Sequence, residues 1–284
     1  MKTKVKIPAK INLTLDITGS ENNYHIIRSL CASVGLYDTV TVKKRPDNAI
    51  TITETRIKSG VPVTENNAFK AAKLFKETFH VPGVDVTIDK NIPVGGGLGG
   101  SSADVAAVLI AMNRLFKINA ELRPLADSIG SDASYMLKGG YAVLRGRGEK
   151  ITYLPIKTVL YVILITADKG MSAKEAYKLY DDLKIYSEPT TVAAAKYLKS
   201  GEVDKLCGML KNDLYRPVLT KLPEIEDNIN ALKSVGALNA AMSGSGSVAY
   251  GIFESAKKMK LAEKELLKTY KKENVIALKT VPSE

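Results

Sequence analysis

A glycine-rich segment at residues 93–104 constrains the fold of this chain more than any other feature. It lies between a strand-like run at Val84 to Ile88 and an apolar helical pattern that begins at Val105. Five of the six residues from 95 to 100 are glycine, which lets the backbone approach a bound group closely. The start of the following helix offers unpaired N–H groups and the positive end of the helix dipole. The segment therefore indicates a phosphate site for a nucleotide, the alternative being a glycine-rich turn without a ligand. The residues expected to contact the nucleotide are Pro93, Gly95, Gly96, Gly97, Leu98, Gly99, Gly100, Ser101 and Ser102.

Three well-known phosphate loops do not fit this segment. Gly95, Gly97 and Gly100 have the spacing of the dinucleotide fingerprint, but 92 residues precede Pro93 and the chain at 122–127 is typical of a helix. A dinucleotide fold instead needs an early loop and an acidic residue at the end of the next strand. A Walker loop ends in Gly-Lys-Ser/Thr, and no lysine occurs in this one. The His-Arg-Asp and Asp-Phe-Gly motifs of protein kinases are also missing from the sequence.

Composition favours a soluble globular protein of the cytoplasm. The chain has 284 residues, and its longest apolar run, Val159 to Ile165, is too short to span a membrane. The N-terminus lacks the apolar core of a signal peptide. Two cysteines and two histidines provide neither a disulfide framework nor a histidine metal cluster. We therefore expect a cytoplasmic protein without a membrane partner.

The formal net charge of +11 raises the question of nucleic-acid binding. Much of the excess lies in a lysine-rich helical pattern at 257–272, whose leucines form an apolar face. That pattern is typical of a solvated helix surface, so we expect no nucleic-acid partner. A positive field also suits an enzyme whose substrates are anionic.

The hydrophobic patterns predict an α+β protein with two lobes. Strands and helices are mixed without regular βαβ alternation, and the second half begins near Lys157. We therefore expect domains at 1–156 and 157–284. Predicted strands are Val5–Ile7, Asn12–Ile17, Thr39–Lys43, Ile50–Thr55, Val84–Ile88, Gly140–Leu144, Val159–Thr166, two strands flanking 243–246, and Val275–Leu278. Predicted helices are Asn66–Phe79, one from Val105, Glu121–Ser128, Ala173–Asp182, Thr191–Leu198, Asp204–Lys211, Glu224–Ser234 and the lysine-rich helix.

Six segments, in order along nearly the whole chain, resemble the GHMP small-molecule kinases. They are Pro8 to Leu13, Tyr24-His25, the loop from Pro93 to Asp104, Ile129 to Asp132, Gly146 to Glu149, and Met242 to Gly246. The resemblance implies a two-lobed GHMP kinase fold with the active site in the cleft between the lobes. Within the family, the chain is similar to members that transfer the ATP γ-phosphate to the 2-hydroxyl of 4-diphosphocytidyl-2-C-methyl-D-erythritol, a step of non-mevalonate isoprenoid synthesis.

The resemblance also implies roles for individual residues. Asp132 matches the general base, and Lys10 matches the lysine that lowers the pKa of the substrate hydroxyl. Asn12, Tyr24, His25 and Tyr177 match the residues that bind the cytidine-diphosphate substrate, and Asn66 matches an asparagine on the adenine side. Mg²⁺ is expected with ATP, held largely by phosphate oxygens and water. Ser101 or Ser102 could add a hydroxyl and Asp104 a carboxylate, although Asp104 could equally interact with the helix dipole.

Two other functions stay open at the level of sequence. After Asp132 the family has a hydrophobic residue, proline and phenylalanine, whereas this chain has Ala133-Ser134-Tyr135. The chain could be a GHMP kinase for a different small alcohol, which would not need Tyr24, His25 and Tyr177. It could also be a nucleotide-binding protein that does not catalyse transfer.

Overall fold

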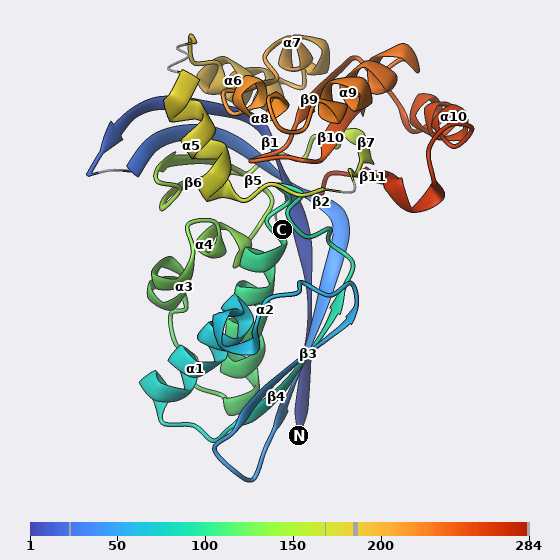
Figure 1. The fold of residues 1–284 in the computed structure, drawn as a ribbon. Coiled ribbons are helices and arrows are strands. Elements are labelled where there is room, and N and C mark those ends of the chain that lie inside the picture. The colour runs from blue at the N-terminus through green and yellow to red at the C-terminus, as the bar shows by residue number, and fades with distance from the viewer. Residues whose placement is uncertain (23, 168, 184–186, 283–284) are drawn as a thin grey trace. The chain divides into compact units, whose positions relative to one another are not determined.

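The computed structural model describes residues 1–22, 24–167, 169–183 and 187–282 (Figure 1). The described residues form two compact units, and neither is one continuous stretch of chain. Unit 1 comprises Met1–Ala9, Leu36–Val94 and Gly99–Lys138. Unit 2 comprises Lys10–Gly35, Gly95–Leu98 and Gly139–Glu284. The predicted division at residues 156 and 157 stays a prediction, because segments of the two units alternate along the chain as far as residue 138.

Two long strands supply residues to both units. The strands are β1 (Lys2–Glu21) and β2 (Tyr24–Lys44), which neighbour each other in one sheet. We predicted β1 as two strands and only the end of β2, so those predictions were too short. The predicted strands left out residues 8–11, which begin with Pro8, but a proline is tolerated in a strand where its missing N–H faces no partner strand. Among the described pairings, β8 reaches β1 only at Thr14 and Leu15, which leaves Pro8 on an unpaired edge.

Unit 1 is a small sheet with helices packed on it. β3 (Ile50–Arg56) pairs in parallel with β4 (Val84–Lys90), which pairs antiparallel with the end of β2. In β4, Val84, Val86 and Ile88 are buried while the residues between them are more exposed, the period of two expected of a strand with one covered face. The helices are α1 (Asn67–Phe79), α2 (Gly100–Phe116), α3 (Arg123–Ile129) and α4 (Ala133–Met136), with a 3-10 turn at Val63–Glu65. Helix α1 packs on α2 and β3 (Figure 1).

Unit 2 contains a four-stranded antiparallel sheet in the order β11-β7-β10-β9. Its strands are β7 (Tyr161–Ile165), β9 (Asn239–Met242), β10 (Ala249–Phe253) and β11 (Val275–Lys279). Residues Val162 to Ile165 of β7 are all fully buried, so both faces of this central strand are covered, which explains its continuous apolar sequence. β5 (Tyr141–Gly146) and β6 (Lys150–Leu154) form a hairpin beside the start of β2, and β8 (Lys211–Asn212) pairs with β1.

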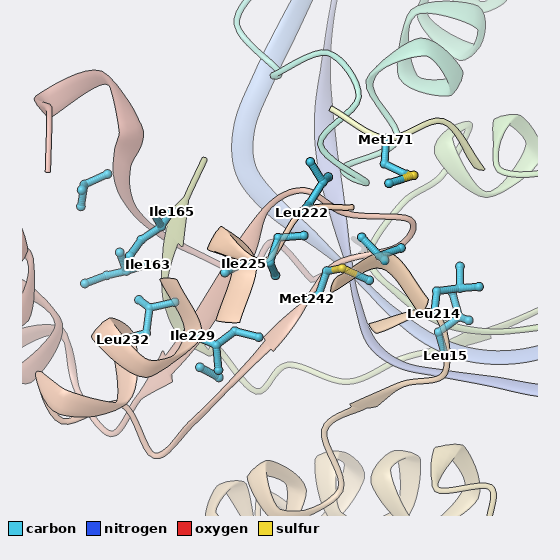
Figure 2. Close-up of a cluster of buried hydrophobic side chains, with 14 of the residues drawn as sticks. Leu15, Ile163, Ile165, Met171, Leu214, Leu222, Ile225, Ile229, Leu232 and Met242 are labelled. Carbon is cyan, nitrogen blue, oxygen red and sulfur yellow. The ribbon is translucent and has the colours of Figure 1, made fainter. Parts of the chain in front are cut away.

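The core of unit 2 lies between this sheet and its helices. In α9 (Glu224–Ser234), the residues Ile225, Ile229 and Leu232 recur at helical spacing and enter a cluster with Ile163 and Ile165 of β7 (Figure 2). The other helices are α5 (Ala173–Leu183), α6 (Thr191–Ser200), α7 (Val203–Gly208), α8 (Tyr215–Leu219), α10 (Ala256–Leu266) and a 3-10 turn at Lys272–Asn274. The helix predicted from Asp204 to Lys211 was too long, because α7 ends at Gly208 and Lys211 begins β8.

Candidate functional site

The glycine loop has alternating backbone conformations that only glycine adopts readily. Gly95, Gly97 and Gly99 have φ angles of +68°, +70° and +71°. L-residues with a side chain rarely populate this region. At Gly97 the space for a side chain is also filled, because a Cβ there would lie 2.0 Å from the carbonyl oxygen of Ser243. The glycines therefore serve both the shape of the loop and its close approach to another loop.

The loop carbonyls accept hydrogen bonds from the rest of unit 2. Four consecutive carbonyl groups are held in this way. Gly95 accepts from the N–H groups of Met171 (3.1 Å) and Ser247 (3.2 Å), Gly96 from that of Val248 (3.3 Å), Gly97 from the Ser243 hydroxyl (3.0 Å), and Leu98 from the Lys10 N–H (3.0 Å).

This arrangement orients the peptide groups of the loop. Within the described parts of the chain, no group accepts a hydrogen bond from the backbone N–H groups of residues 95–100. In each peptide group the N–H points away from the C=O. Because the carbonyl groups of the loop are hydrogen-bonded to the surrounding protein, the N–H groups of the same peptide units point away from those partners. A concave run of such donors is suited to bind phosphate oxygens.

A second glycine loop, residues 243–246, holds the first one. It connects β9 and β10, and its Ser243 hydroxyl accepts from the Asn12 N–H (3.3 Å) while donating to Gly97. The buried Asn212 side chain donates to the carbonyls of Met242 (2.9 Å) and Gly244 (2.7 Å). The sequence pattern identified residues 243–246 as a family match but gave them no role, and it gave no signal for Asn212.

The serines at the start of α2 lie where hydroxyl donors were predicted. Gly99 is the N-cap of α2, so Ser101 and Ser102 occupy its first turn. The Ser101 hydroxyl accepts a hydrogen bond from the Asn67 amide at 3.0 Å. Both side chains therefore lie at the positive end of the helix dipole.

Asp104 does not have the helix-dipole role predicted for it, and its surroundings disfavour the predicted contact with Mg²⁺. The first turn of α2 contains no acidic residue, and Asp104 lies buried in the second turn. Its Oδ2 is 2.6 Å from the ammonium of Lys90, which is also 2.9 Å from Asp38. A carboxylate already paired with a buried ammonium is a poor ligand for Mg²⁺, because the lysine charge repels the ion.

The Lys90 cluster carries one more negative than positive formal charge. Burial, the largest influence, raises the pKa of Asp104 to about 7, and the charge of Asp38 adds to this while Lys90 opposes it. Asp104 Oδ1 is buried without a hydrogen-bond partner among the described residues. The backbone N–H groups of Asn91 and Ile92 donate to Asp38 at 2.6 and 2.8 Å, so this cluster also anchors the strand that enters the glycine loop.

Asp132 is positioned by a short helix that the sequence did not predict. It precedes α4, and the Met136 N–H donates to its carbonyl at 3.1 Å. Ser134 donates to Asp127, and Tyr135 is fully buried. Ser134 and Tyr135, which replace the proline and phenylalanine of the family, thus anchor the turn at Asp132 by a hydrogen bond and by packing.

Lys10 and Asn12 are neighbouring buried side chains on β1. The Lys10 ammonium donates to Asn12 Oδ1 at 2.5 Å, and the Asn12 amide donates to Ser29 (2.8 Å) and Cys31 (3.3 Å) on β2. Side chains two residues apart on a strand lie on the same face. Lys10 and Asp132 belong to different units, so the structure describes each in its own surroundings.

The predicted substrate aromatics gather in unit 2. His25 stacks on Tyr177 with ring centroids 4.6 Å apart and planes at 17°. The exposed Tyr24 ring is covered on one face by the Arg147 guanidinium, 4.4 Å from its centroid. Arg147 belongs to the Gly146–Glu149 segment of the family pattern, for which the sequence gave no individual role.

Asn66, predicted on the adenine side, has a local structural role. Its side-chain oxygen accepts from the Ala68 N–H at 2.9 Å, so it is the N-cap of α1. Its amide donates to Glu54 at 3.1 Å. Contact with a nucleotide stays a prediction for this residue.

The residue ranges that the structure describes hold no cluster of three or more His, Cys, Asp or Glu side chains suited to bind a metal ion. No helix in these ranges has the length and apolar character needed to cross a membrane.

Comparisons with known proteins agree with the geometry of the loop. The GHMP kinases N terminal domain matches residues 66–143, and the GHMP kinases C terminal domain matches residues 194–272. A 4-diphosphocytidyl-2-C-methyl-D-erythritol kinase of Clostridium beijerinckii is 38% identical over 277 residues, covering 94% of this chain and 97% of the relative.

Solved structures show the same relationship. A crystal structure of 4-(cytidine 5'-diphospho)-2C-methyl-D-erythritol kinase has a TM-score of 0.81 and 26% identity, covering 98% of both chains. Homoserine kinase from Cytophaga hutchinsonii has a TM-score of 0.75 at 20% identity, over 99% of this chain and 95% of the other, which shows a shared fold.

Proposed function

The chain belongs to the GHMP kinases, and on that premise we propose that it transfers the γ-phosphoryl group of ATP to the 2-hydroxyl of 4-diphosphocytidyl-2-C-methyl-D-erythritol. The observation that carries the proposal is the glycine loop, whose carbonyls bind the protein and whose N–H groups remain for phosphate. The relatives that cover nearly the whole chain support the choice of acceptor. The pair of aromatic residues at 24 and 25 agrees with a substrate that carries a nucleobase.

Transfer requires the acceptor hydroxyl to lose its proton as it attacks. We assign this proton to the Asp132 carboxylate, at the start of α4, as general base. The Lys10 ammonium would stabilise negative charge on the acceptor oxygen, and its hydrogen bond to Asn12 orients it. The backbone N–H groups of the loop would stabilise the charge on the transferring phosphoryl group.

Mg²⁺ completes this assignment. When bound with ATP it would neutralise charge on the phosphate oxygens, and Ser101 and Ser102 are the side chains that could donate a hydroxyl oxygen to it. The protein itself binds the phosphates and positions the acceptor.

ADP release by the purified chain tests the proposal. Mg-ATP is supplied with the cytidine-diphosphate acceptor, and in parallel with homoserine and mevalonate. We expect turnover with the cytidine acceptor alone. Turnover only with another alcohol would replace the acceptor, and ATP binding without turnover would favour the non-catalytic alternative.

The Asp132→Asn variant tests the base in the same assay. We expect kcat to fall by about 10²–10⁴-fold while ATP affinity changes little, because the variant keeps the shape but cannot accept the proton. Asp204→Asn makes the same chemical change on the exposed face of α7 and serves as the control. Retention of full activity by Asp132→Asn would exclude Asp132 as the base.

A further inference from the structure

Helix α5 presents three side chains to His25. Tyr177, Tyr180 and Asp181 are spaced i, i+3 and i+4, so they share one face of the helix. Tyr177 stacks on the imidazole, and the Tyr180 ring meets it edge-on at 5.8 Å and 87°. Asp181 Oδ1 lies 2.7 Å from His25 Nε2. The two tyrosine rings therefore fix the plane of the imidazole, and the hydrogen bond to Asp181 fixes its rotation within that plane, with all three contacts coming from α5.

The hydrogen bond to Asp181 has a chemical consequence for His25. A carboxylate oxygen can only accept, so the Nε2 of His25 must carry the proton of this bond. In the neutral imidazole the other nitrogen, Nδ1, then has a lone pair and is an acceptor. A free ring could present either nitrogen as the donor, whereas this one is restricted to a single tautomer.

We propose that Asp181 is a positioning residue that holds His25 with Nε2 protonated, so that Nδ1 accepts a hydrogen bond from an amino-bearing pyrimidine. The inference rests on the proposed function, in which His25 contacts the base of the substrate. Cytosine has an exocyclic amine donor at the position where uracil has a carbonyl acceptor. With uracil, the Nδ1 of His25 would face the carbonyl oxygen of the base, and neither atom can donate a hydrogen bond. A His25 held in this tautomer therefore disfavours uracil.

A purely structural role for this pair is disfavoured by its exposure. The Asp181 side chain is 60% exposed, whereas that of His25 is 17% exposed. Ion pairs and hydrogen bonds with an exposed partner contribute little to folding stability. Removal of the carboxylate should therefore leave the protein folded and change mainly how His25 presents its ring.

The kinetic test compares two substrates that differ only in the base. KM and kcat are measured for the cytidine-diphosphate acceptor and its uridine counterpart with the wild type and with Asp181→Ala. We expect KM for the cytidine acceptor to rise about tenfold with kcat nearly unchanged, and the preference for cytidine to fall about tenfold. Asp181→Glu, which keeps the acceptor, should recover part of this preference.

Asp182 provides a matched control on the same helix. It is the next residue, it is exposed, and no contact with His25 is found for it among the described side chains. Asp182→Ala removes the same charge and should keep the wild-type preference for cytidine. An unchanged preference in Asp181→Ala, or an equal loss in Asp182→Ala, would overturn the proposal.

Nitrogen-15 NMR tests the tautomer without any substrate. The chain has only two histidines, His25 and His80, so the variant His80→Asn assigns the imidazole signals. The spectra are recorded at a pH where the imidazoles are neutral. In the wild type we expect His25 to carry its proton on Nε2 alone. In Asp181→Ala we expect the proton to exchange between Nε2 and Nδ1, so that both tautomers are present. A wild-type His25 protonated at Nδ1 would overturn the inference. If NMR shows the single Nε2–H tautomer but the protein does not turn over the cytidine acceptor, only the proposed function is rejected.

Discussion

Gly97 is a residue at which two constraints meet. Its φ of +70° disfavours any side chain, and the Ser243 carbonyl occupies the position of a Cβ at 2.0 Å. We predict that Gly97→Ala displaces the loop and lowers the affinity for ATP by about 10²-fold, since displacements near 1 Å have effects of this size. Isothermal titration with Mg-ATP measures the loss, and far-UV circular dichroism checks that the fold persists.

Gly208 gives the matched control for this change. It ends α7, and a Cβ at this position would have no atom within 4 Å. Gly208→Ala should therefore bind ATP as the wild type does. An ATP affinity of Gly97→Ala equal to that of Gly208→Ala would show that the loop tolerates the side chain.

Asp104 should make stability depend on pH. Its pKa in the folded protein is raised from the ordinary value of 3.8 to about 7, and burial is the largest cause. The folded state therefore binds this proton more tightly than the unfolded state, and the stabilisation is lost as pH rises from about 4 through 7. Asp104→Asn cannot titrate, so the free energy of unfolding of the wild type minus that of the variant should decrease over this range.

Urea denaturation at pH 5, 6, 7 and 8 measures this difference. Lys90 and Asp38 stay in place in the variant, so the comparison isolates one carboxyl group. A difference that rises with pH would mean that Asp104 is held ionised by Lys90, and would contradict the predicted direction.

The turn between β5 and β6 places a cation on an aromatic ring. Gly146 and Gly148 have φ angles of +72° and +115°, and between them Arg147 covers Tyr24. An exposed cation–π contact contributes about 0.5–1 kcal/mol, which corresponds to about two- to fivefold in affinity. If Tyr24 binds the base, Arg147→Gln should weaken binding of cytidine 5'-diphosphate by this factor.

Arg145 on the same hairpin provides the comparison. It is exposed and donates to Thr152 across the hairpin at 3.4 Å. Arg145→Gln removes an equal charge from the hairpin and should leave the affinity unchanged. Equal losses in both variants would indicate a general effect of charge rather than the contact with Tyr24.

At the scale of elements, the sequence predicted best where the pattern was long. The apolar periodicity of α2 and α9 and the continuous apolar run of β7 each gave the correct type of element. Short elements were missed: α4 and α8 have four and five residues, too few for a helical period to appear. The length of β1 was also missed, because it depends on which strands lie beside Pro8.

At the scale of the whole molecule, the interleaved units should prevent the second half from folding alone. Unit 2 needs Lys10–Gly35, and β8 has β1 as its parallel partner. We predict that a fragment of residues 157–284 shows no cooperative thermal transition by circular dichroism. The full chain under the same conditions is the control. A cooperative transition in the fragment would instead support the domain boundary predicted at 156 and 157.

In the candidate site, too, features formed by neighbouring residues were predictable and contacts between residues far apart in the sequence were not. The position of the glycine loop and of the helix after it could be predicted, because a run of glycines before an apolar helical pattern is a local feature of the sequence. The groups that hold the loop could not, because Asn212 and Met171 contact it or its neighbour across long stretches of sequence. The ion pair of Lys90 and Asp38 could not be predicted for the same reason, since the two residues come together only when β2 and β4 pair.

The hydrogen bond between Ser243 and Gly97 also sets an order of events during synthesis. It joins residues 146 positions apart. At 5–20 residues per second, the ribosome adds the second glycine loop about 7 to 30 s after the first. A nascent chain that ends before residue 243 has the glycines and serines but lacks Ser243, Ser247 and Val248, which bind the carbonyls of Gly95, Gly96 and Gly97. The capacity to bind nucleotide should therefore emerge only after residue 243 and the strand that follows it have left the ribosome.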